Sequence, residues 1–212
     1  MTPPPLVKGI LSTTSRLGIG RNNDLLLNIP NDLKRFKELT LGQIVVMGRK
    51  TWDSLSFKPL PNRTNVILSS HPKALQKAHK QTDTPVYFTD YAHFERTITQ
   101  AGLDKTVYII GGAETLEHFI KHTDAKWKPS ELLLTYIKTL PPTKLDPDTF
   151  LKSLPEEYTL SSYSAQHTHA KTNSQYTYLV YGREPHHRTD EKNYLNIMRK
   201  ILNTGIPKTD RT

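Results

Sequence analysis

Short apolar runs rich in Val, Ile, Leu and Tyr recur along the chain and alternate with stretches of helical periodicity. The central runs lack the apolar–polar alternation of half-exposed strands, which is typical of strands buried on both faces. The expected strands cover residues 6–11, 43–48, 64–70, 85–89, 106–112, 131–137, 158–164 and 175–182. The expected helices lie near residues 31–39, 49–55, 73–80, 91–101 and 113–121.

The order of these elements predicts an α/β fold with a twisted, mostly parallel sheet and helices on both sides. The run AHFERTI places Phe94 and Ile98 four residues apart, and AETLEHFI does the same with Leu116 and Ile120, as on one helix face. The last two strands alternate more strongly and follow each other without a helix. We therefore expect them to form a closing antiparallel hairpin.

The chain divides after its last expected strand. Residues 1–183 form the main domain, and the polar stretch EPHHRTD (184–190) has the composition of a linker. Residues 191–212 begin with an amphipathic helical pattern that Gly205 ends. One helix and a basic tip cannot build a second core, so this segment is expected to be the first part of something longer.

Composition narrows the class of protein. With 212 residues, 35% of them hydrophobic and 23% charged, the chain suits a soluble globular domain with an appendage. Its longest apolar runs are too short to cross a bilayer, and MTPPPLVKG lacks the features of a secretory signal. Zero cysteines exclude disulfides and thiolate chemistry. We expect a cytoplasmic protein without membrane contact.

The formal net charge of +9 raises the question of a nucleic-acid partner. Lys and Arg are scattered, and no basic run is interleaved with aromatic residues, so no nucleic acid is expected. A positive excess equally attracts small anions such as phosphorylated cofactors or polycarboxylates. The pairs His167, His169 and His186, His187 lack a partner at metal-ligand spacing. They are interpreted as solvated polar segments, and no metal site is expected.

Three strand ends carry residues suited to an anionic ligand. VYIIGGAETL (107–116) runs from strand through two glycines into a helix start, where backbone and helix dipole favour anionic oxygens. VVMGRKTWDSL (45–55) does the same through one glycine, and VILSSHP (66–72) ends in two hydroxyls. Arg49 with Ser69 and Ser70 could hold a phosphate monoester at the carboxyl ends of neighbouring strands.

The stretch LLLNIPNDLKRF (25–36) places one acid in an apolar lining. A helix beginning after Pro30 carries Asp32 and Phe36 one turn apart, with Leu33 beside them. Asp32 is either an ordinary first-turn acid favoured by the helix dipole or a functional carboxylate.

Together, these residues resemble the dihydrofolate reductase family over residues 6–182. The resemblance implies that family's fold, a mostly parallel eight-stranded twisted sheet with an antiparallel C-terminal strand and helices on both faces. A related pteridine or riboflavin-pathway reductase would not be expected to combine Asp32, Arg63 and the P-L-P-x-R loop. The matching segments are LGIGRNNDL (17–25), I-P-N-D-L-x-x-F (29–36), VVMGRKTWDSL (45–55), KPLPNRTNVILSS (58–70), IIGGAE (109–114) and LLTYI (133–137).

The resemblance implies reduction of 7,8-dihydrofolate to tetrahydrofolate by hydride transfer from NADPH, and binding of antifolates. Asp32 is then the catalytic carboxylate, which pairs with N3 and the 2-amino group of the pterin and favours protonation of N5 through water. Thr135 hydrogen-bonds this carboxylate, and Arg63 binds the glutamate α-carboxylate. The implied substrate-binding residues are Ile10, Asp32, Leu33, Phe36, Leu55, Arg63, Ile110 and Thr135.

On the cofactor side, the resemblance assigns the 2′-phosphate to Arg49, Ser69 and Ser70, which implies NADPH over NADH. It also implies that the peptide bond between Gly111 and Gly112 is cis. The implied cofactor-binding residues are Ser12, Ile19, Gly20, Gly48, Arg49, Lys50, Thr51, Leu68, Ser69, Ser70, Gly111, Gly112, Ala113, Glu114 and Thr115.

Four residues depart from the family pattern. Leu26-Leu27 stands where Pro-Trp is usual, Leu116 replaces a common Tyr beside the nicotinamide, and Ser12 replaces a usual Ala. Leu27 cannot donate the hydrogen bond that helps to hold water near the pterin. The alternative is therefore a catalytically impaired reductase-fold module that binds a ligand or partner, although the intact residues around Asp32 and Arg49 argue against it.

Residues 191–212 resemble the opening of thymidylate synthase, in which Arg211 would bind the nucleotide phosphate of a full-length synthase. This position is what a fused reductase–synthase would show, and a dimer is expected only through a full synthase domain. The synthase reaction needs a cysteine nucleophile, so this chain would not perform it. An ordinary amphipathic terminal helix remains the other interpretation.

Overall fold

A computed structural model describes residues 5–80, 82–122, 124–138, 140–141 and 146–183. The predicted linker 184–190, the predicted helix within 191–212 and Arg211 lie outside these residues. Its helices are α1 (Pro30–Thr40), α2 (Arg49–Ser54), α3 (Pro72–Ala78), α4 (Phe94–Ala101) and α5 (Ala113–Ile120). Its strands are β1 (Val7–Thr14), β2 (Gly18–Arg21), β3 (Asp24–Leu25), β4 (Ile44–Gly48), β5 (Thr64–Leu68), β6 (Val86–Thr89), β7 (Val107–Gly111), β8 (Glu131–Ile137), β9 (Thr149–Phe150), β10 (Tyr158–Tyr163), β11 (His167–His169) and β12 (Ser174–Arg183).

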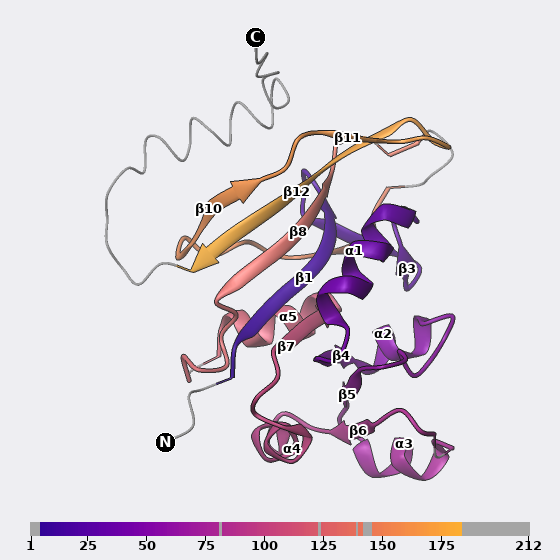
Figure 1. The fold of residues 1–212 in the computed structure, drawn as a ribbon, viewed down its shortest axis with the longest axis vertical. Helices are drawn as coiled ribbons and strands as arrows, with labels where there is room; N and C mark the ends of the chain where they lie inside the picture. Colours follow the sequence, from indigo (N-terminus) through magenta and orange to yellow (C-terminus); the bar gives the residue numbers. More distant parts are fainter. Residues whose placement is uncertain (1–4, 81, 123, 139, 142–145, 184–212) are drawn as a thin grey trace.

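The main sheet has the strand order β10-β12-β8-β1-β7-β4-β5-β6, and β11 adds to it by pairing with β12 (Figure 1). All neighbours from β8 to β6 are parallel. Strand β12 runs antiparallel to both β8 and β10. The predicted mostly parallel sheet with an antiparallel C-terminal strand is confirmed.

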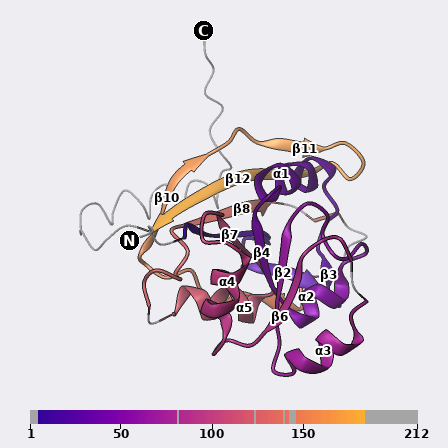
Figure 2. The ribbon, with the colours of Figure 1, turned by 60° about the horizontal axis from the view of Figure 1, so that its bottom comes forward.

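Side chains alternate between the two faces of the buried strands, which explains their continuous apolar sequences. On β4, Val46 packs in one core cluster with the aromatic and aliphatic residues of α4 and α5, such as Phe94 and Phe119. Val45 packs in another with Trp52 of α2 and Phe36 of α1. Helices therefore cover both faces, as predicted, and α1 lies beside β8 and β12 in both views (Figures 1 and 2).

Four short strands were not predicted from the sequence. Strands β2, β3 and β9 form a separate three-stranded sheet, and β11 contains the H-x-H pair. That pair was interpreted as a solvated segment; both histidines are partly buried, and His167 stacks on Tyr176 with ring centroids 5.3 Å apart. These strands have two to four residues each, too few to show a period of two.

Helix α4 begins at Phe94, later than the predicted residue 91. The carboxylate of Asp90 accepts a hydrogen bond from the backbone N–H of His93 at 2.9 Å, and this closes a turn before the helix. Within the described ranges, no group of acidic or imidazole side chains is arranged to hold a metal ion. No helix of the described chain combines the length and apolar character needed to cross a bilayer.

Candidate active site

Two neighbouring strands and one helix hold the side chain of Asp32. Ser12 of β1 and Thr135 of β8 are directly paired in the parallel register, so their side chains project from the same face of the sheet. Thr135 Oγ1 donates to Asp32 Oδ1 at 2.5 Å, and Ser12 Oγ donates to Asp32 Oδ2 at 2.8 Å. We call these three side chains the carboxylate clamp. It fixes both oxygens of an acid in the first turn of α1.

The beginning of α1 follows directly from the sequence around Asp32. Pro30 occupies the first helical position, where its missing N–H costs no hydrogen bond and its fixed φ suits a helix. The backbone N–H of Leu33 donates to the carbonyl of Ile29 at 3.0 Å, which closes the first turn. The helix start therefore places the Asp32 side chain over the sheet.

Beside the clamp lies a polar wall that the sequence did not indicate. Asn31 Nδ2 is 3.4 Å from the hydroxyl of Tyr176, and the guanidinium carbon of Arg35 is 4.4 Å from the ring centroid of Tyr178. Burial raises the pKa of Tyr178 to about 12, and the charges of Tyr176 and Asp32 act in the same direction. Tyr178 therefore stays neutral at physiological pH.

Apolar side chains of the same sheet face lie next to the clamp. Ile10 is 7% exposed and belongs to the core cluster of that face, against which Phe36, Leu55 and Ile110 pack. Leu33 is 40% exposed. The structure thus gathers four of the five apolar residues assigned to the substrate in one cluster and leaves Leu33 at the surface.

Arg63 is almost fully buried, with 6% of its surface exposed. Its Nε donates to the carbonyl of Pro61 at 3.0 Å and its Nη1 to Thr40 Oγ1 at 3.2 Å. Its guanidinium carbon lies 5.8 Å from the ring centroid of Phe36, which places it beside the apolar cluster. Burial lowers the pKa of Arg63, but a guanidinium remains a cation with five N–H donors, of which these two contacts within the described residues use two.

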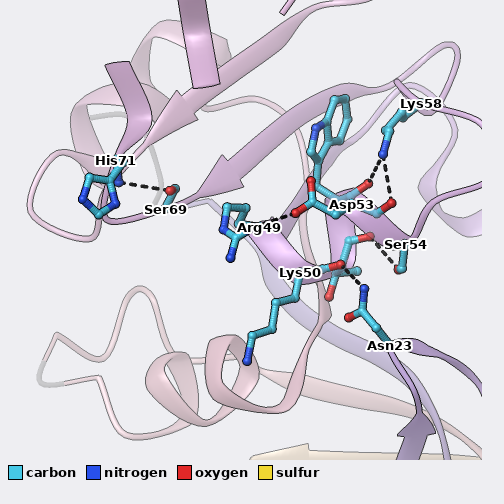
Figure 3. A network of polar contacts seen from close by, with 10 residues as sticks. Asn23, Arg49, Lys50, Asp53, Ser54, Lys58, Ser69 and His71 are labelled. Carbon is cyan, nitrogen blue, oxygen red and sulfur yellow. Dashed lines mark hydrogen bonds and ion pairs between the residues drawn. The ribbon is translucent and has the colours of Figure 1, made fainter. Parts of the chain in front are cut away.

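Arg49, Ser69 and Ser70 follow the carboxyl ends of two adjacent strands, and we call them the phosphate cradle. Gly48 and Leu68 are paired at the ends of β4 and β5. Figure 3 shows the guanidinium of Arg49 directed toward Asp53, with Nη1 2.8 Å from Oδ2. Across the site, the hydroxyl of Ser69 accepts from the backbone N–H of His71 at 3.0 Å.

The Ser70 hydroxyl lies 2.9 Å from Nδ1 of His71. The guanidinium and two hydroxyls suit a phosphate monoester, because each can donate to its oxygens. The partners that the protein now supplies are exposed and local, so a ligand can replace them.

The glycine turn between β7 and α5 packs against the end of β4. The peptide bond between Gly111 and Gly112 is cis, as the resemblance implied, and Gly111 has a φ of +117°, which only glycine adopts readily. A Cβ on Gly112 would lie 3.5 Å from Thr51 Oγ1, and one on Gly48 would lie 2.7 Å from Thr115 Oγ1. The first turns of α2 and α5 therefore approach each other at glycines, where no side chain covers the backbone.

The small sheet is tied to the start of α2. Asn23 Nδ2 donates to the carbonyl of Lys50 at 2.9 Å, which ties the β2–β3 turn to the start of α2 (Figure 3). Ile19 of β2 packs against the large core cluster. The remaining residues assigned to the cofactor lie on several elements, namely Gly20 in β2, Leu68 at the end of β5, and Ala113 and Glu114 in the first turn of α5.

The leucines that depart from the family pattern are core residues. Leu26 and Leu27 are 3% and 6% exposed and pack with Ile137 and Tyr176. Leu116 is 1% exposed. None of them offers a hydrogen-bond donor to the site, so polar contacts to Asp32 come from the sheet.

Known proteins share both the sequence pattern and this architecture. The sequence profile described as "Dihydrofolate reductase" matches residues 6–183. The chain belongs to the dihydrofolate reductase family. The dihydrofolate reductase of Haemophilus influenzae is 32% identical over 145 residues, which cover 68% of this chain and 78% of that protein.

A longer relative extends across the entire sequence. The bifunctional dihydrofolate reductase-thymidylate synthase of Paramecium tetraurelia is 32% identical over 219 residues, covering 100% of this chain and 44% of that protein. The chain spans about half the length of several relatives that it matches.

Among solved structures, the dihydrofolate reductase of Enterococcus faecalis complexed with NADP(H) and RAB-propyl has the same fold. Its TM-score is 0.66 at 23% identity, over 85% of this chain and 97% of that chain.

Proposed function

We propose that residues 1–183 reduce 7,8-dihydrofolate to 5,6,7,8-tetrahydrofolate with NADPH as the hydride donor. The carboxylate clamp carries this proposal, because it presents both oxygens of one acid beside an apolar cluster. Membership of the dihydrofolate reductase family supports it. The relative from Enterococcus faecalis was solved with NADP(H), which supports the choice of cofactor.

In this proposal, Asp32 binds the N3–H and 2-amino group of the pterin through two charge-assisted hydrogen bonds. Ile10, Phe36 and Leu55 exclude water from the ring, and Arg63 binds the α-carboxylate of the glutamate. The negative charge of Asp32 favours the protonated form of N5, with the proton arriving from water. Hydride adds to C6 and the proton to N5, so the N5–C6 double bond is reduced.

The phosphate cradle fits the 2′-phosphate of NADPH by its donor chemistry. Arg49 contributes a charged fork, and Ser69 and Ser70 contribute hydroxyls. Thr51 and the first turn of α5, Ala113 to Thr115, would hold the pyrophosphate with backbone N–H groups and hydroxyls. Ile19 and Gly20 would border the nicotinamide, which supplies the hydride when bound.

We further propose that residues 191–212 are the beginning of a thymidylate synthase domain. The alignment with the Paramecium protein over this whole chain supports this division, with residues 184–190 as the linker. Dimerisation would then depend on a full synthase domain, in which Arg211 binds the nucleotide phosphate. A cytoplasmic location is part of this proposal, as are antifolate binding and the absence of a nucleic-acid partner.

The proposed reaction is tested by the loss of NADPH absorbance on adding 7,8-dihydrofolate to the wild-type chain, Asp32→Asn and Asp83→Asn. Asp83 is an exposed acid distant from the clamp in sequence and serves as the matched charge control. We expect kcat/KM to fall on the order of 100-fold in Asp32→Asn, because an amide supplies one acceptor and no negative charge. Asp83→Asn should match the wild type.

NADPH binding, followed by fluorescence, should survive in all three proteins because Asp32 lies outside the phosphate cradle. A wild-type chain that binds NADPH without turnover would refute the reductase and favour the binding-module alternative. Salt-sensitive binding of a labelled oligonucleotide would instead indicate a nucleic-acid binder.

A further inference from the structure

The family resemblance assigned Ser12 to the cofactor site, where it would border the nicotinamide, yet its hydroxyl donates to Asp32. Ser12 Oγ donates to Oδ2 at 2.8 Å while Thr135 Oγ1 donates to Oδ1 at 2.5 Å. The two donors come from paired positions of β1 and β8. The carboxylate is therefore held by two donors on two rigid neighbouring strands.

Two donors do what one cannot. The terminal torsion of an Asp side chain is broad, so a single hydrogen bond to one oxygen leaves the carboxylate plane able to turn. A second donor to the other oxygen fixes that plane. Bidentate recognition of an N–H and an adjacent amino group requires both oxygens in one plane, so a fixed plane lowers the entropy lost on binding.

The leucines that precede α1 have no side-chain donor that could replace the hydroxyl of Ser12. Leu26 and Leu27, which precede α1, are buried in an apolar cluster and carry no side-chain donor. Within the described residues, Ser12 and Thr135 supply the side-chain hydrogen bonds recorded for the Asp32 oxygens. Alanine, the usual residue at this place in the family, would leave Oδ2 without the contact from β1.

We propose that Ser12 is a positioning residue that sets the plane of the Asp32 carboxylate and so determines the affinity for rings carrying an adjacent N–H and amino group. This inference deepens the proposed function and rests on it for the identity of the natural ring. It also predicts that part of the antifolate affinity of this chain depends on a serine hydroxyl.

The test compares the wild type with Ser12→Ala, Ser12→Thr and Thr13→Val. Thr13 is buried on the same strand, and its hydroxyl contacts the backbone carbonyl of Thr14, so Thr13→Val controls for loss of a strand hydroxyl. The first measurement is the ¹³C resonance of the Asp32 carboxyl group in the ligand-free protein, assigned by its loss in Asp32→Asn. It should move in Ser12→Ala, return toward its original place in Ser12→Thr and stay unchanged in Thr13→Val.

The second measurement is the dissociation constant of a 2,4-diaminopyrimidine. We expect it to rise about tenfold in Ser12→Ala, the size of one hydrogen bond to a charged group, and to recover to within about threefold in Ser12→Thr. The KM for dihydrofolate should rise more than kcat falls. The affinity for NADPH should stay within about twofold in every variant.

Weaker NADPH binding in Ser12→Ala with unchanged diaminopyrimidine affinity would overturn the proposal and return Ser12 to the nicotinamide edge. An unmoved carboxyl resonance would overturn it as well. Neither measurement requires turnover, so a wild-type chain that reduces no dihydrofolate refutes the proposed reaction while the resonance still decides the role of Ser12.

Discussion

The carboxylate clamp and the phosphate cradle are built in opposite ways. Thr135 is 2% exposed, and the partners of Asp32 come from the sheet, far away in sequence. In the cradle, Arg49 pairs with Asp53 one turn along the same helix, and their side chains are 52% and 45% exposed. An exposed ion pair of this kind contributes little to stability, so a ligand could replace Asp53 as the partner of Arg49 at a small cost in free energy. The clamp is already held by contacts within the protein, whereas the proposed phosphate would have to replace the protein's own contacts at the cradle.

Among changes at the cradle and at Arg63, removing the cradle's cation should alter ligand affinity most. In Arg49→Gln we expect the KM for NADPH to rise about 10- to 100-fold and the KM for NADH to stay unchanged, because only NADPH carries the phosphate that we propose the guanidinium binds. Steady-state kinetics with both cofactors measure the preference. Arg96→Gln, at an exposed position of α4, is the matched control. Equal losses with both cofactors would contradict the assignment of Arg49 to the 2′-phosphate.

Replacing the buried Arg63 should lower the affinity for dihydrofolate selectively. In Arg63→Lys we expect the KM for dihydrofolate to rise about tenfold, because an ammonium cannot form two parallel hydrogen bonds to a carboxylate. The affinity for a diaminopyrimidine without a glutamate tail should change little. Comparing the two ligands by kinetics and fluorescence separates the roles. A similar loss for both would show that Arg63 acts through Thr40 and the local backbone instead.

Breaking the Arg49–Asp53 ion pair should raise the affinity for NADPH, a smaller change of opposite sign. In Asp53→Asn, Arg49 loses its protein partner and a negative charge leaves the site, so we expect NADPH to bind about two- to fivefold more tightly at low salt. Glu38→Gln makes the same charge change in the Lys34–Glu38 pair of α1, which has the same spacing along a helix. If both variants tighten binding equally, net charge explains the effect and the local pair does not.

The sequence predicted those parts of the molecule whose signal is local. Each buried strand, helix start and strand-end motif is encoded within a short continuous stretch of the chain. Its own pattern of apolar and small side chains therefore indicates it. The position of Asp32 and its Thr135 partner came from the family resemblance, and the structure contains that hydrogen bond. The cis bond at Gly111 came from the same source.

Side-chain contacts that depend on the register between strands could not be predicted from the sequence. The carboxylate clamp requires β1 and β8 to pair in the one alignment that sets Ser12 beside Thr135, and nothing near residue 12 encodes that alignment. The polar wall of Arg35, Tyr176 and Tyr178 likewise forms only when β12 inserts beside β8. Strands β2, β3 and β9 are defined by their pairing and not by composition.

The placement of β12 has a consequence for the newly made chain. This strand is last in the described sequence but lies inside the sheet, between β8 and β10, and it supplies Tyr176 and Tyr178 behind the clamp. The cradle residues leave the ribosome about 100 residues earlier, which is on the order of ten seconds at typical rates of synthesis. Until β12 emerges, β8 has an open edge and the clamp lacks its polar wall. Translation therefore separates the two proposed ligand sites in time: all residues of the phosphate cradle have been synthesised while the proposed ring site still lacks its last strand.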